Sequence, residues 1–355
     1  MPLTTIKGSN IDAVLTNTQL NTTGTASSAN ILPGTFVWSS GSRTAMTNYA
    51  ASDPATPAAG DVWYQAGNIK VASNQNILTG IWSSSGNLPR SEEQAPACGQ
   101  AAAGLLAGGE NSGYKNITNS YDGTAWNTLG GTLATARANA PLIGNLNAAI
   151  FCGGQAGSVL DGCEEFDGLS WSAGGTLTDD LTSGVAEGFG ILTAAVCAGG
   201  SLSASVSAVT QLYNGTSWST GNSCLTTKNY AACAGKDSAG LVTGGSAPAY
   251  TTETEEYDGT SWSAGGALNT GRSQLAGAGT QTAALAFAGS TGSDSTVTEE
   301  YDGTAWTNVD ALTTARRSAG GNGSQSRAFV TGGYGGAYLN STEDWTKPQT
   351  QYYDV

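Results

Sequence analysis

The chain has 355 residues, of which 11% are charged, and its formal net charge is −14. Such an acidic surface argues against nucleic acids and anionic membranes as partners, because both need a basic binding surface. The chain has no histidine, which excludes histidine acid–base catalysis, Ser-His-Asp and Cys-His nucleophiles and most zinc or copper sites. We therefore expect no metal and no cofactor. No apolar stretch approaches 18 residues, so we expect no membrane insertion.

The six cysteines contain no Cys-x-x-Cys pair, and their spacing follows the repeat described below. We interpret them as small buried apolar residues of a chain made in a reducing cytosol, with a disulfide framework as the alternative. Residues 1–7 contain no apolar core segment, so they do not predict a signal peptide.

Residues 1–75 are rich in Thr, Asn, Ala and Ser and lack the repeat. Short apolar patches at 11–15 and 36–38 are compatible with short strands, and the Pro-rich stretch at 54–60 indicates a turn or linker. Residues 61–71 predict a β-hairpin that turns at Gly67-Asn68. Because such a polar segment buries little core alone, we expect an irregular or β anchoring segment held by a partner or by other copies of the chain.

From about residue 76 one phrase recurs. It reads Tyr-Asp-Gly-Thr-Ser-Trp at 257–262 and Tyr-Asp-Gly-Thr-Ala-Trp at 301–306 and 121–126, with looser copies at 166–171 and 213–218. Its tryptophans are 45, 47, 44 and 44 residues apart, and a further step of 44 residues backwards reaches Trp82. A fixed period of about 40–50 residues is typical of β-propellers. The structural tryptophans of the repeat are Trp82, Trp126, Trp171, Trp218, Trp262 and Trp306.

Each repeat divides into four segments, which we name A to D. Segment A is dominated by small residues, B is a short apolar run ending in Gly-Gly or a relative, C carries Glu-Glu-Tyr or a variant, and D opens near the Trp. Asp-Gly between C and D is a strong hairpin signal. We expect four antiparallel strands per blade, with A innermost because the axis is crowded, and with Tyr and Trp filling the space between blades.

The count predicts a six-bladed all-β propeller over residues 76–355. The last repeat reaches segment C at 341–345 and has no segment D, whereas residues 77–83 form a segment D with no A, B or C before it. We therefore predict that the N-terminal strand around Ile81-Trp82 closes the last blade beside the C-terminal strands, which leaves no blade edge unpaired.

Charged residues also recur with the repeat. Adjacent glutamates such as Glu255-Glu256 face opposite sides of a strand, so they are not a catalytic pair. We predict inter-strand or inter-blade ion pairs, with ligand contact as the alternative. The basic positions are Arg90, Arg137, Lys228, Arg272 and Arg316, and the acidic ones are Glu164, Glu255, Glu299 and Glu343.

Gly-Gly, then Glu-x-Tyr-Asp, then Trp at this spacing resembles kelch-repeat β-propellers over about 270 residues. The chain departs from that pattern in its Asp-Gly and at Asn119 and Gln211. Kelch folds include a copper oxidase, but its copper ligands are histidines, which this chain lacks. Sialidases are also six-bladed, yet their Asp box separates Asp from Gly by one residue, whereas here the two are adjacent.

The stretches 53–64, 264–272 and 276–283 resemble kelch-type structural proteins of marine tailed phages, especially cyanophages. The resemblance implies a non-enzymatic virion component of tail, fibre or surface decoration, made in the host cytoplasm. On this interpretation residues 1–75 attach it, in several copies, to other virion proteins of tail, capsid or fibre.

A receptor- or glycan-binding adhesin is the alternative function. The B–C loops contain tyrosines among Gly, Asn and Ser, and aromatic rings in such surroundings can stack on sugars of a host surface. A glycosidase ranks lower. The candidate ligand-binding residues on this B–C loop face are Tyr114, Tyr250, Tyr334 and Tyr338.

Overall fold

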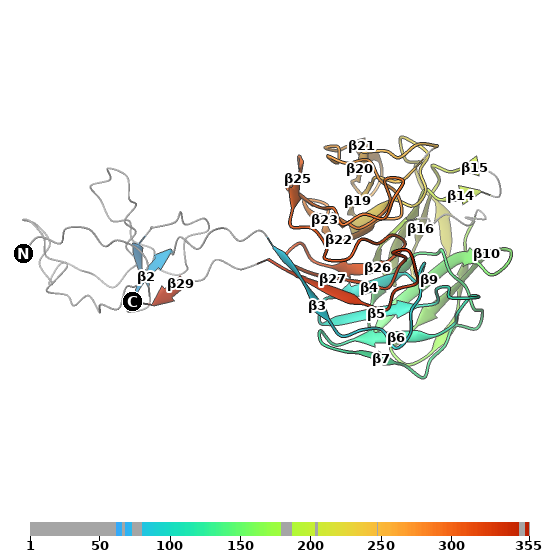
Figure 1. Cartoon of the computed structure of the whole chain (residues 1–355). Coiled ribbons are helices and arrows are strands. Elements are labelled where there is room, and N and C mark those ends of the chain that lie inside the picture. The colour runs from blue at the N-terminus through green and yellow to red at the C-terminus, as the bar shows by residue number, and fades with distance from the viewer. Residues whose placement is uncertain are drawn as a thin grey trace, which may run out of the picture. The chain divides into compact units, whose positions relative to one another are not determined.

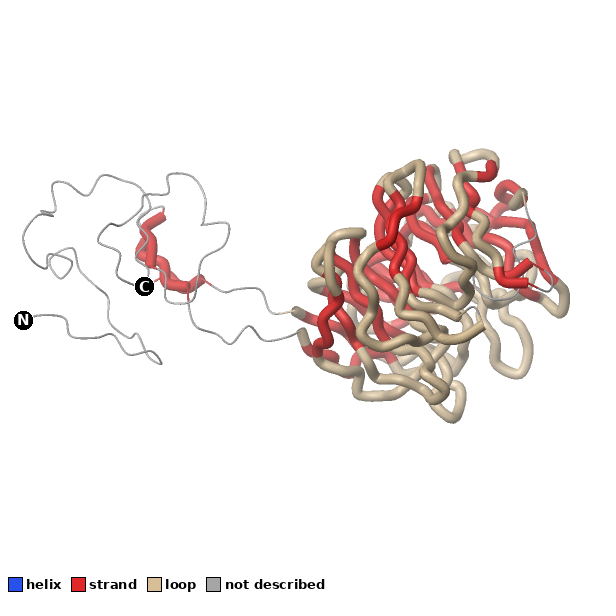
Figure 2. Tube along the Cα trace, turned by 90° about the horizontal axis from the view of Figure 1, so that it is seen from above, coloured by secondary structure: helices blue, strands red, loops and turns tan. Residues whose placement is uncertain are grey.

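The computed structural model describes residues 62–65, 68–72, 80–178, 187–202, 205–246, 248–347 and 352–354. They fall in two compact units, one spanning Thr79–Lys347 and the other combining Met1–Leu78 with Pro348–Val355. All regular structure of the described residues is β-strand, joined by loops and turns (Figure 2). No helix in this part of the chain could cross a bilayer.

The larger unit is a six-bladed β-propeller whose blades are four-stranded antiparallel sheets (Figure 1), as predicted. Blade 1 contains β4 (Ala97–Gln100), β5 (Ala103–Ala107), β6 (Thr118–Tyr121) and β7 (Trp126–Thr128). Blade 2 contains β8 (Leu142–Asn145), β9 (Ala148–Gln155), β10 (Val159–Phe166) and β11 (Trp171–Thr176). Blade 3 contains β12 (Glu187–Ile191), β13 (Ala194–Ala198), β16 (Thr210–Tyr213) and β17 (Trp218–Thr220).

The remaining blades follow the same order from the axis outwards. Blade 4 contains β18 (Ala232–Lys236), β19 (Ala239–Thr243), β20 (Thr254–Tyr257) and β21 (Trp262–Ala264). Blade 5 contains β22 (Ala276–Thr280), β23 (Ala283–Phe287), β24 (Thr298–Tyr301) and β25 (Trp306–Val309). Blade 6 contains β26 (Gly320–Gly323), β27 (Arg327–Thr331), β28 (Thr342–Thr346) and β3 (Ile81–Ser85). A separate ribbon joins β14 (Ser201–Leu202) to β15 (Ser205–Val206).

The first strand of each blade is innermost, as expected from its small residues. First strands of neighbouring blades contact one another all the way round the ring. Near the turn into the second strand, Gly279 has φ of +104°, and a Cβ there would lie 2.2 Å from the carbonyl oxygen of Ala283. Only glycine fits such a site. The same position is glycine in all six blades: Gly99, Gly144, Gly190, Gly235, Gly279 and Gly323.

The core lies between the blades, as predicted, and consists of one apolar cluster at each of the six blade interfaces. At the interface of blades 6 and 1, Phe329 packs against Tyr121 and Trp126, with ring centroids 5.6 and 5.7 Å apart. The indole N–H of the repeat tryptophan usually donates to a threonine hydroxyl of the preceding blade at 2.8–2.9 Å. These bonds are Trp82–Thr298, Trp126–Thr342, Trp171–Thr118, Trp262–Thr210 and Trp306–Thr254.

Trp218 is the exception to this pattern. Its buried indole N–H has no hydrogen-bond partner among the described residues. The acceptor position in the preceding blade holds Cys163 in place of threonine, and a thiol is a weak acceptor. Burial raises the pKa of the neighbouring Cys152 thiol well above its usual value. No disulfide joins the six cysteines, and five are buried, which agrees with their predicted role as small core residues.

The N-terminal strand closes the ring as predicted. β3 pairs antiparallel with β28, with Trp82 opposite Trp345 and Ile81 opposite Thr346. Trp82 also packs edge-on against Phe287 of blade 5 at a centroid distance of 5.1 Å. Blade 6 therefore joins two segments from opposite ends of the propeller sequence (Figure 1).

The Asp-Gly turns form the outer hairpins between the third and fourth strands, also as predicted. Asp302 Oδ1 accepts the backbone N–H groups of Thr304 and Ala305 at 2.8 Å, and Gly303 has φ of +90°. These backbone donors lower the pKa of Asp302 below its usual value. The aspartate of the repeated phrase therefore accepts hydrogen bonds from the backbone of its own turn, which is a structural role.

The smaller unit contains one described sheet, in the order β1-β2-β29. The predicted hairpin is confirmed, since β1 (Val62–Gln65) pairs with β2 (Asn68–Ala72). β29 (Tyr352–Asp354) adds to β2, so the expectation that the propeller runs to residue 355 is wrong at its C-terminal end. The predictions for residues 11–15, 36–38 and 54–60 lie outside the described residues.

Successive blades are also joined by aromatic hydroxyls. The tyrosine near the end of the third strand donates to a carboxylate on the third strand of the preceding blade. Tyr301 Oη donates to Glu256 Oε1 at 2.6 Å, and burial together with this carboxylate raises the pKa of Tyr301 to about 12. The equivalent bonds are Tyr121–Asp344 and Tyr213–Glu165.

Three blades lack this bond. In blade 6 Trp345 stands at the tyrosine position, and its indole N–H donates to the carbonyl oxygen of Gln325. In blade 2 both partners are absent together, because Phe166 has no hydroxyl and the preceding blade presents Ser120. In blade 4 only the acceptor is absent. Leu212 stands at the carboxylate position, and the buried Tyr257 hydroxyl has no partner among the described residues. A buried hydroxyl without a partner reduces stability.

Tyr301 and Tyr257 therefore form a matched pair for mutation. Tyr301→Phe is expected to lower the free energy of unfolding by about 1–2 kcal/mol, because it removes a hydrogen bond to a charged group. Tyr257→Phe is expected to leave it unchanged or to raise it, because no bond is lost. Urea unfolding followed by tryptophan fluorescence measures both. Equal losses in the two variants would contradict the pairing scheme.

Candidate binding site at the axial mouth

The repeated charges form buried ion pairs within blades, as predicted. Arg272 and Glu299 of blade 5 are fully buried, with the guanidinium 2.5 Å from the carboxylate. Glu299 Oε2 also accepts the backbone and side-chain N–H groups of Asn269 at 2.6 and 2.8 Å. The equivalent pairs are Arg137–Glu164, Lys228–Glu255 and Arg316–Glu343. The carboxylates and cations with the strongest burial thus hold strands together.

Arg90 does not occupy the repeat position assigned to it. The backbone carbonyl of Glu92 accepts the N–H of Gly333, as the carbonyl of Arg137 accepts that of Gly109, so Glu92 holds the repeat position. Arg90 pairs with Glu92 at 2.6 Å. The usual acidic position of blade 1 holds Asn119. Blade 1 therefore has a different, local ion pair, in which the repeat position carries the carboxylate and Arg90, 21% exposed, carries the positive charge.

A ring of residues with left-handed backbone surrounds one mouth of the central axis. They stand just before the first strands of five blades, two residues after the repeat position of the ion pair. The corresponding residue of blade 3 lies outside the described residues. Their φ values are +51° to +56°, and they are Gln94, Asn139, Tyr230, Gln274 and Ser318.

The backbone of these residues forms a chain of hydrogen bonds from blade to blade. Asn139 N donates to Gln94 O at 3.3 Å, and Gln94 N donates to Ser318 O at 2.8 Å. Ser318 N donates to Gln274 O at 3.0 Å, and Gln274 N donates to Tyr230 O at 2.7 Å. Hydrogen bonds between neighbouring blades therefore hold these residues in the left-handed conformation. These bonds offset the conformational free energy that a non-glycine residue loses there.

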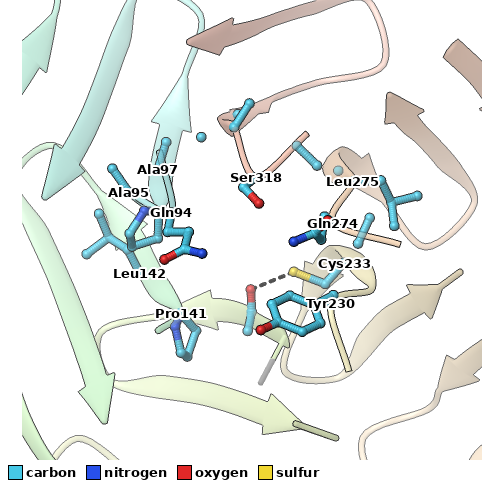
Figure 3. Close-up of a pocket in the computed structure, with 18 of the residues that line it drawn as sticks. Gln94, Ala95, Ala97, Pro141, Leu142, Tyr230, Cys233, Gln274, Leu275 and Ser318 are labelled. Carbon is cyan, nitrogen blue, oxygen red and sulfur yellow. Dashed lines mark hydrogen bonds between the residues drawn. The ribbon is translucent and has the colours of Figure 1, made fainter. Parts of the chain in front are cut away.

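These residues line a cavity of about 110 Å³ on the propeller axis. The side chains of Gln94, Tyr230, Gln274 and Ser318 point towards its centre from different blades (Figure 3). Small and apolar residues of the inner strands and of the segments just before them, together with Asn322, form the rest of the lining. They include Ala95, Ala97, Pro141, Leu142 and Leu275.

The polar atoms at this mouth are neutral and only partly satisfied. Asn139 Nδ2 donates to Gln94 Oε1 at 2.9 Å. Asn139 Oδ1 and Ser318 Oγ are buried without a hydrogen-bond partner among the described residues. Burial also raises the pKa of Tyr230, so its phenol stays protonated at neutral pH. The mouth can therefore offer several uncharged donors and acceptors to a bound group.

The predicted ligand-binding tyrosines are placed in the loops between second and third strands, but they are not gathered into one site. Tyr334 and Tyr338 pack against each other at right angles, with centroids 6.0 Å apart, and the Arg317 guanidinium lies 4.5 Å from the Tyr334 ring centroid. Tyr114 and Tyr250 belong to blades 1 and 4, and Tyr250 is 46% exposed. Their role in binding stays a prediction.

Within the described residues no group of three or more Cys, Asp or Glu side chains could hold a metal ion. The adjacent glutamates contact different partners, since Glu255 pairs with Lys228 whereas Glu256 accepts from Tyr301. Burial would raise the pKa of Glu255, but hydrogen bonds from Lys228 and Thr226 lower it below its usual value. Glu255 is therefore held as a carboxylate by structural contacts.

Sequence reasoning did not identify the axial ring. Its only signal is variation inside the repeat, because the ring residue is Gln, Asn, Tyr, Gln or Ser while the ion-pair position two residues earlier is charged in every described blade. Such variation indicates that the structure of the blade does not require a particular residue type at this position. No known protein family matches the chain, and a search of curated proteins found no relative.

Proposed function

We propose that the chain is a non-enzymatic virion component that displays its propeller for contact with another macromolecule. The proposal rests on the likeness of the repeat to kelch-type structural proteins of marine tailed phages. The observation that carries it is topological, since both connections to the smaller unit leave the propeller at one edge of blade 6.

The two chain segments that link the units start from paired strands in the propeller and end in paired strands of the smaller unit. On the propeller side, Ile81 of β3 is opposite Thr346 of β28. In the smaller unit, Ala72 of β2 is opposite Tyr352 of β29. Both chain connections between the two units therefore start from blade 6. This arrangement suits a module that is held at one point and exposes its loops.

The arrangement of the charged side chains supports a structural role of the propeller rather than a catalytic one. The most deeply buried cations and carboxylates of the described residues pair with one another inside blades, and the aspartates of the repeat are bound in turns. The loops at the axial mouth instead present neutral amides, hydroxyls and phenols. Such groups recognise a surface without performing acid–base chemistry.

Attachment to particles tests the proposal. Three purified proteins are added to particles that lack the endogenous protein: the full chain, residues 80–347, and the full chain without residues 348–355. Only the full chain is expected to bind, because β29 completes the sheet of the attaching unit. Mass spectrometry of sedimented particles measures incorporation.

Folding of all three proteins is verified by their thermal unfolding, so that a failure to bind cannot reflect a misfolded propeller. Incorporation of residues 80–347 at the level of the full chain would overturn attachment through the smaller unit. Turnover of a glycoside by the full chain would overturn the non-enzymatic assignment.

A further inference from the structure

The residues of the axial ring adopt a left-handed backbone conformation that elsewhere in the described propeller is mostly adopted by glycine. Five of the seven non-glycine residues with positive φ among the described residues belong to the ring. At its other recurring left-handed positions the chain uses glycine in nearly every blade, as in the turn after each first strand, with Ala288 as an exception. Glycine adopts this conformation without the steric cost that a Cβ brings. Side chains are therefore retained at the mouth despite a cost that glycine would remove.

The blade-to-blade hydrogen bonds do not account for these side chains. Those bonds join backbone N–H and C=O groups, which glycine would supply equally well. Only one side-chain hydrogen bond is formed within the ring, from Asn139 to Gln94. The described residues give the side chains of Tyr230, Gln274 and Ser318 no hydrogen-bond partner, although all three point into the cavity (Figure 3). Of these groups, Ser318 Oγ is buried, whereas Tyr230 and Gln274 are half-buried, so all three remain available to a ligand.

The chemistry of the ring defines the ligand. Its side chains are amides, a hydroxyl and a phenol, each able to donate and accept hydrogen bonds, and none of them is charged. Asn139 is 7% exposed. Its buried Oδ1 and the buried Oγ of Ser318 both lack a hydrogen-bond partner among the described residues. Apolar inner-strand residues lie beside these polar groups. Few polar groups over an apolar lining are typical of small-molecule sites.

We propose that the axial mouth binds the edge of an uncharged sugar, whose adjacent hydroxyl groups bond Asn139, Gln274, Ser318 and Tyr230. The cavity volume of about 110 Å³ suits part of one sugar ring, with the remainder outside the mouth. Sugar hydroxyls both donate and accept, so they satisfy the buried Asn139 and Ser318 oxygens and the phenol together. This site goes beyond the proposed display function and does not depend on it.

Saturation-transfer NMR of the full chain with D-glucose, D-galactose and N-acetyl-D-glucosamine tests the site. At least one of these sugars is expected to bind. Gln274→Gly and Ser318→Gly are expected to weaken that binding by about tenfold or more, because each removes a polar contact. The same variants are expected to unfold at an unchanged or higher temperature, because glycine relieves the left-handed conformation.

Gln281→Ala is the matched control, since Gln281 lies in a turn between first and second strands. Its Nε2 donates to the carbonyl oxygens of Gly240 and Tyr257, so its loss is expected to lower the unfolding temperature while sugar binding stays unchanged. The proposal is overturned if the full chain binds none of the three sugars. It is also overturned if the glycine variants bind as the full chain does, or if they unfold at a lower temperature.

Discussion

Replacement of Arg272 by alanine is expected to lower the free energy of unfolding by about 3–5 kcal/mol, because Glu299 stays buried without its cation. Both side chains are fully buried. The guanidinium also donates to the carbonyl oxygens of Ala286 and Ala288 at 2.9 and 3.1 Å, and these acceptors lose their partner too. Denaturant unfolding followed by tryptophan fluorescence measures the loss as a lower midpoint at an unchanged slope.

Lys347→Ala is the control for an exposed pair. Lys347 lies 2.7 Å from Glu300, but its side chain is 32% exposed, so the expected change is about 0–1 kcal/mol. Combining Arg272→Met with Glu299→Leu is expected to recover part of the loss, because no lone charge then remains buried. A loss for Arg272→Ala as small as that for Lys347→Ala would show that the pair does not hold the blade together.

The periodicity of the sequence was sufficient to predict the blades and their closure. Each repeat tryptophan is the first or second residue of the fourth strand of its blade, so the interval between tryptophans measures one blade. Trp82 kept this interval although it precedes every other segment of the repeat. The pairing of Trp82 with Trp345 follows directly from that interval.

The different ion pair of blade 1 was not predicted from the sequence. Aligning repeats by basic residues placed Arg90 with Arg137, whereas the backbone hydrogen bonds place Glu92 there. The two residues are only two positions apart and pair with each other, so a basic residue lies near the expected place although the repeat position itself is acidic. Charge alone therefore cannot fix the register of a repeat, and the backbone pattern is needed.

The axial ring and β29 were missed for different reasons. The ring depends on φ angles and on the convergence of residues about 45 positions apart, and neither leaves a local motif. β29 is three residues long, and its pairing with β2 joins segments almost 300 residues apart in the sequence. Strands this short are set by their partner rather than by their own residues.

Removal of β3 is expected to abolish folding of the propeller. Without residues 81–85 the edge of β28 loses its partner strand, and Trp345, which is fully buried, becomes exposed. Loss of a buried tryptophan such as Trp82 alone costs about 3–5 kcal/mol. Added to the lost strand pairing, this approaches the whole stability of an ordinary domain, about 5–15 kcal/mol.

Two truncated chains separate closure from the rest of the sequence. Residues 80–347 keep β3 and are expected to unfold cooperatively as a monomer, with near-ultraviolet circular dichroism showing packed tryptophans. Residues 86–347 lack β3 and are expected to give no cooperative transition. An open edge also favours pairing between chains, so size-exclusion chromatography is expected to show aggregates of the shorter chain.

A permuted chain tests whether β3 acts only through its place in blade 6. Because Thr346 is opposite Ile81, a copy of residues 81–85 can follow Thr346 across an Asp-Gly turn like those of the other blades. Attaching this copy to residues 86–346 is expected to restore the cooperative transition. If the permuted chain stays unfolded while residues 80–347 fold, closure requires more than the paired strand. If residues 86–347 fold as well as residues 80–347, closure by β3 does not stabilise the ring.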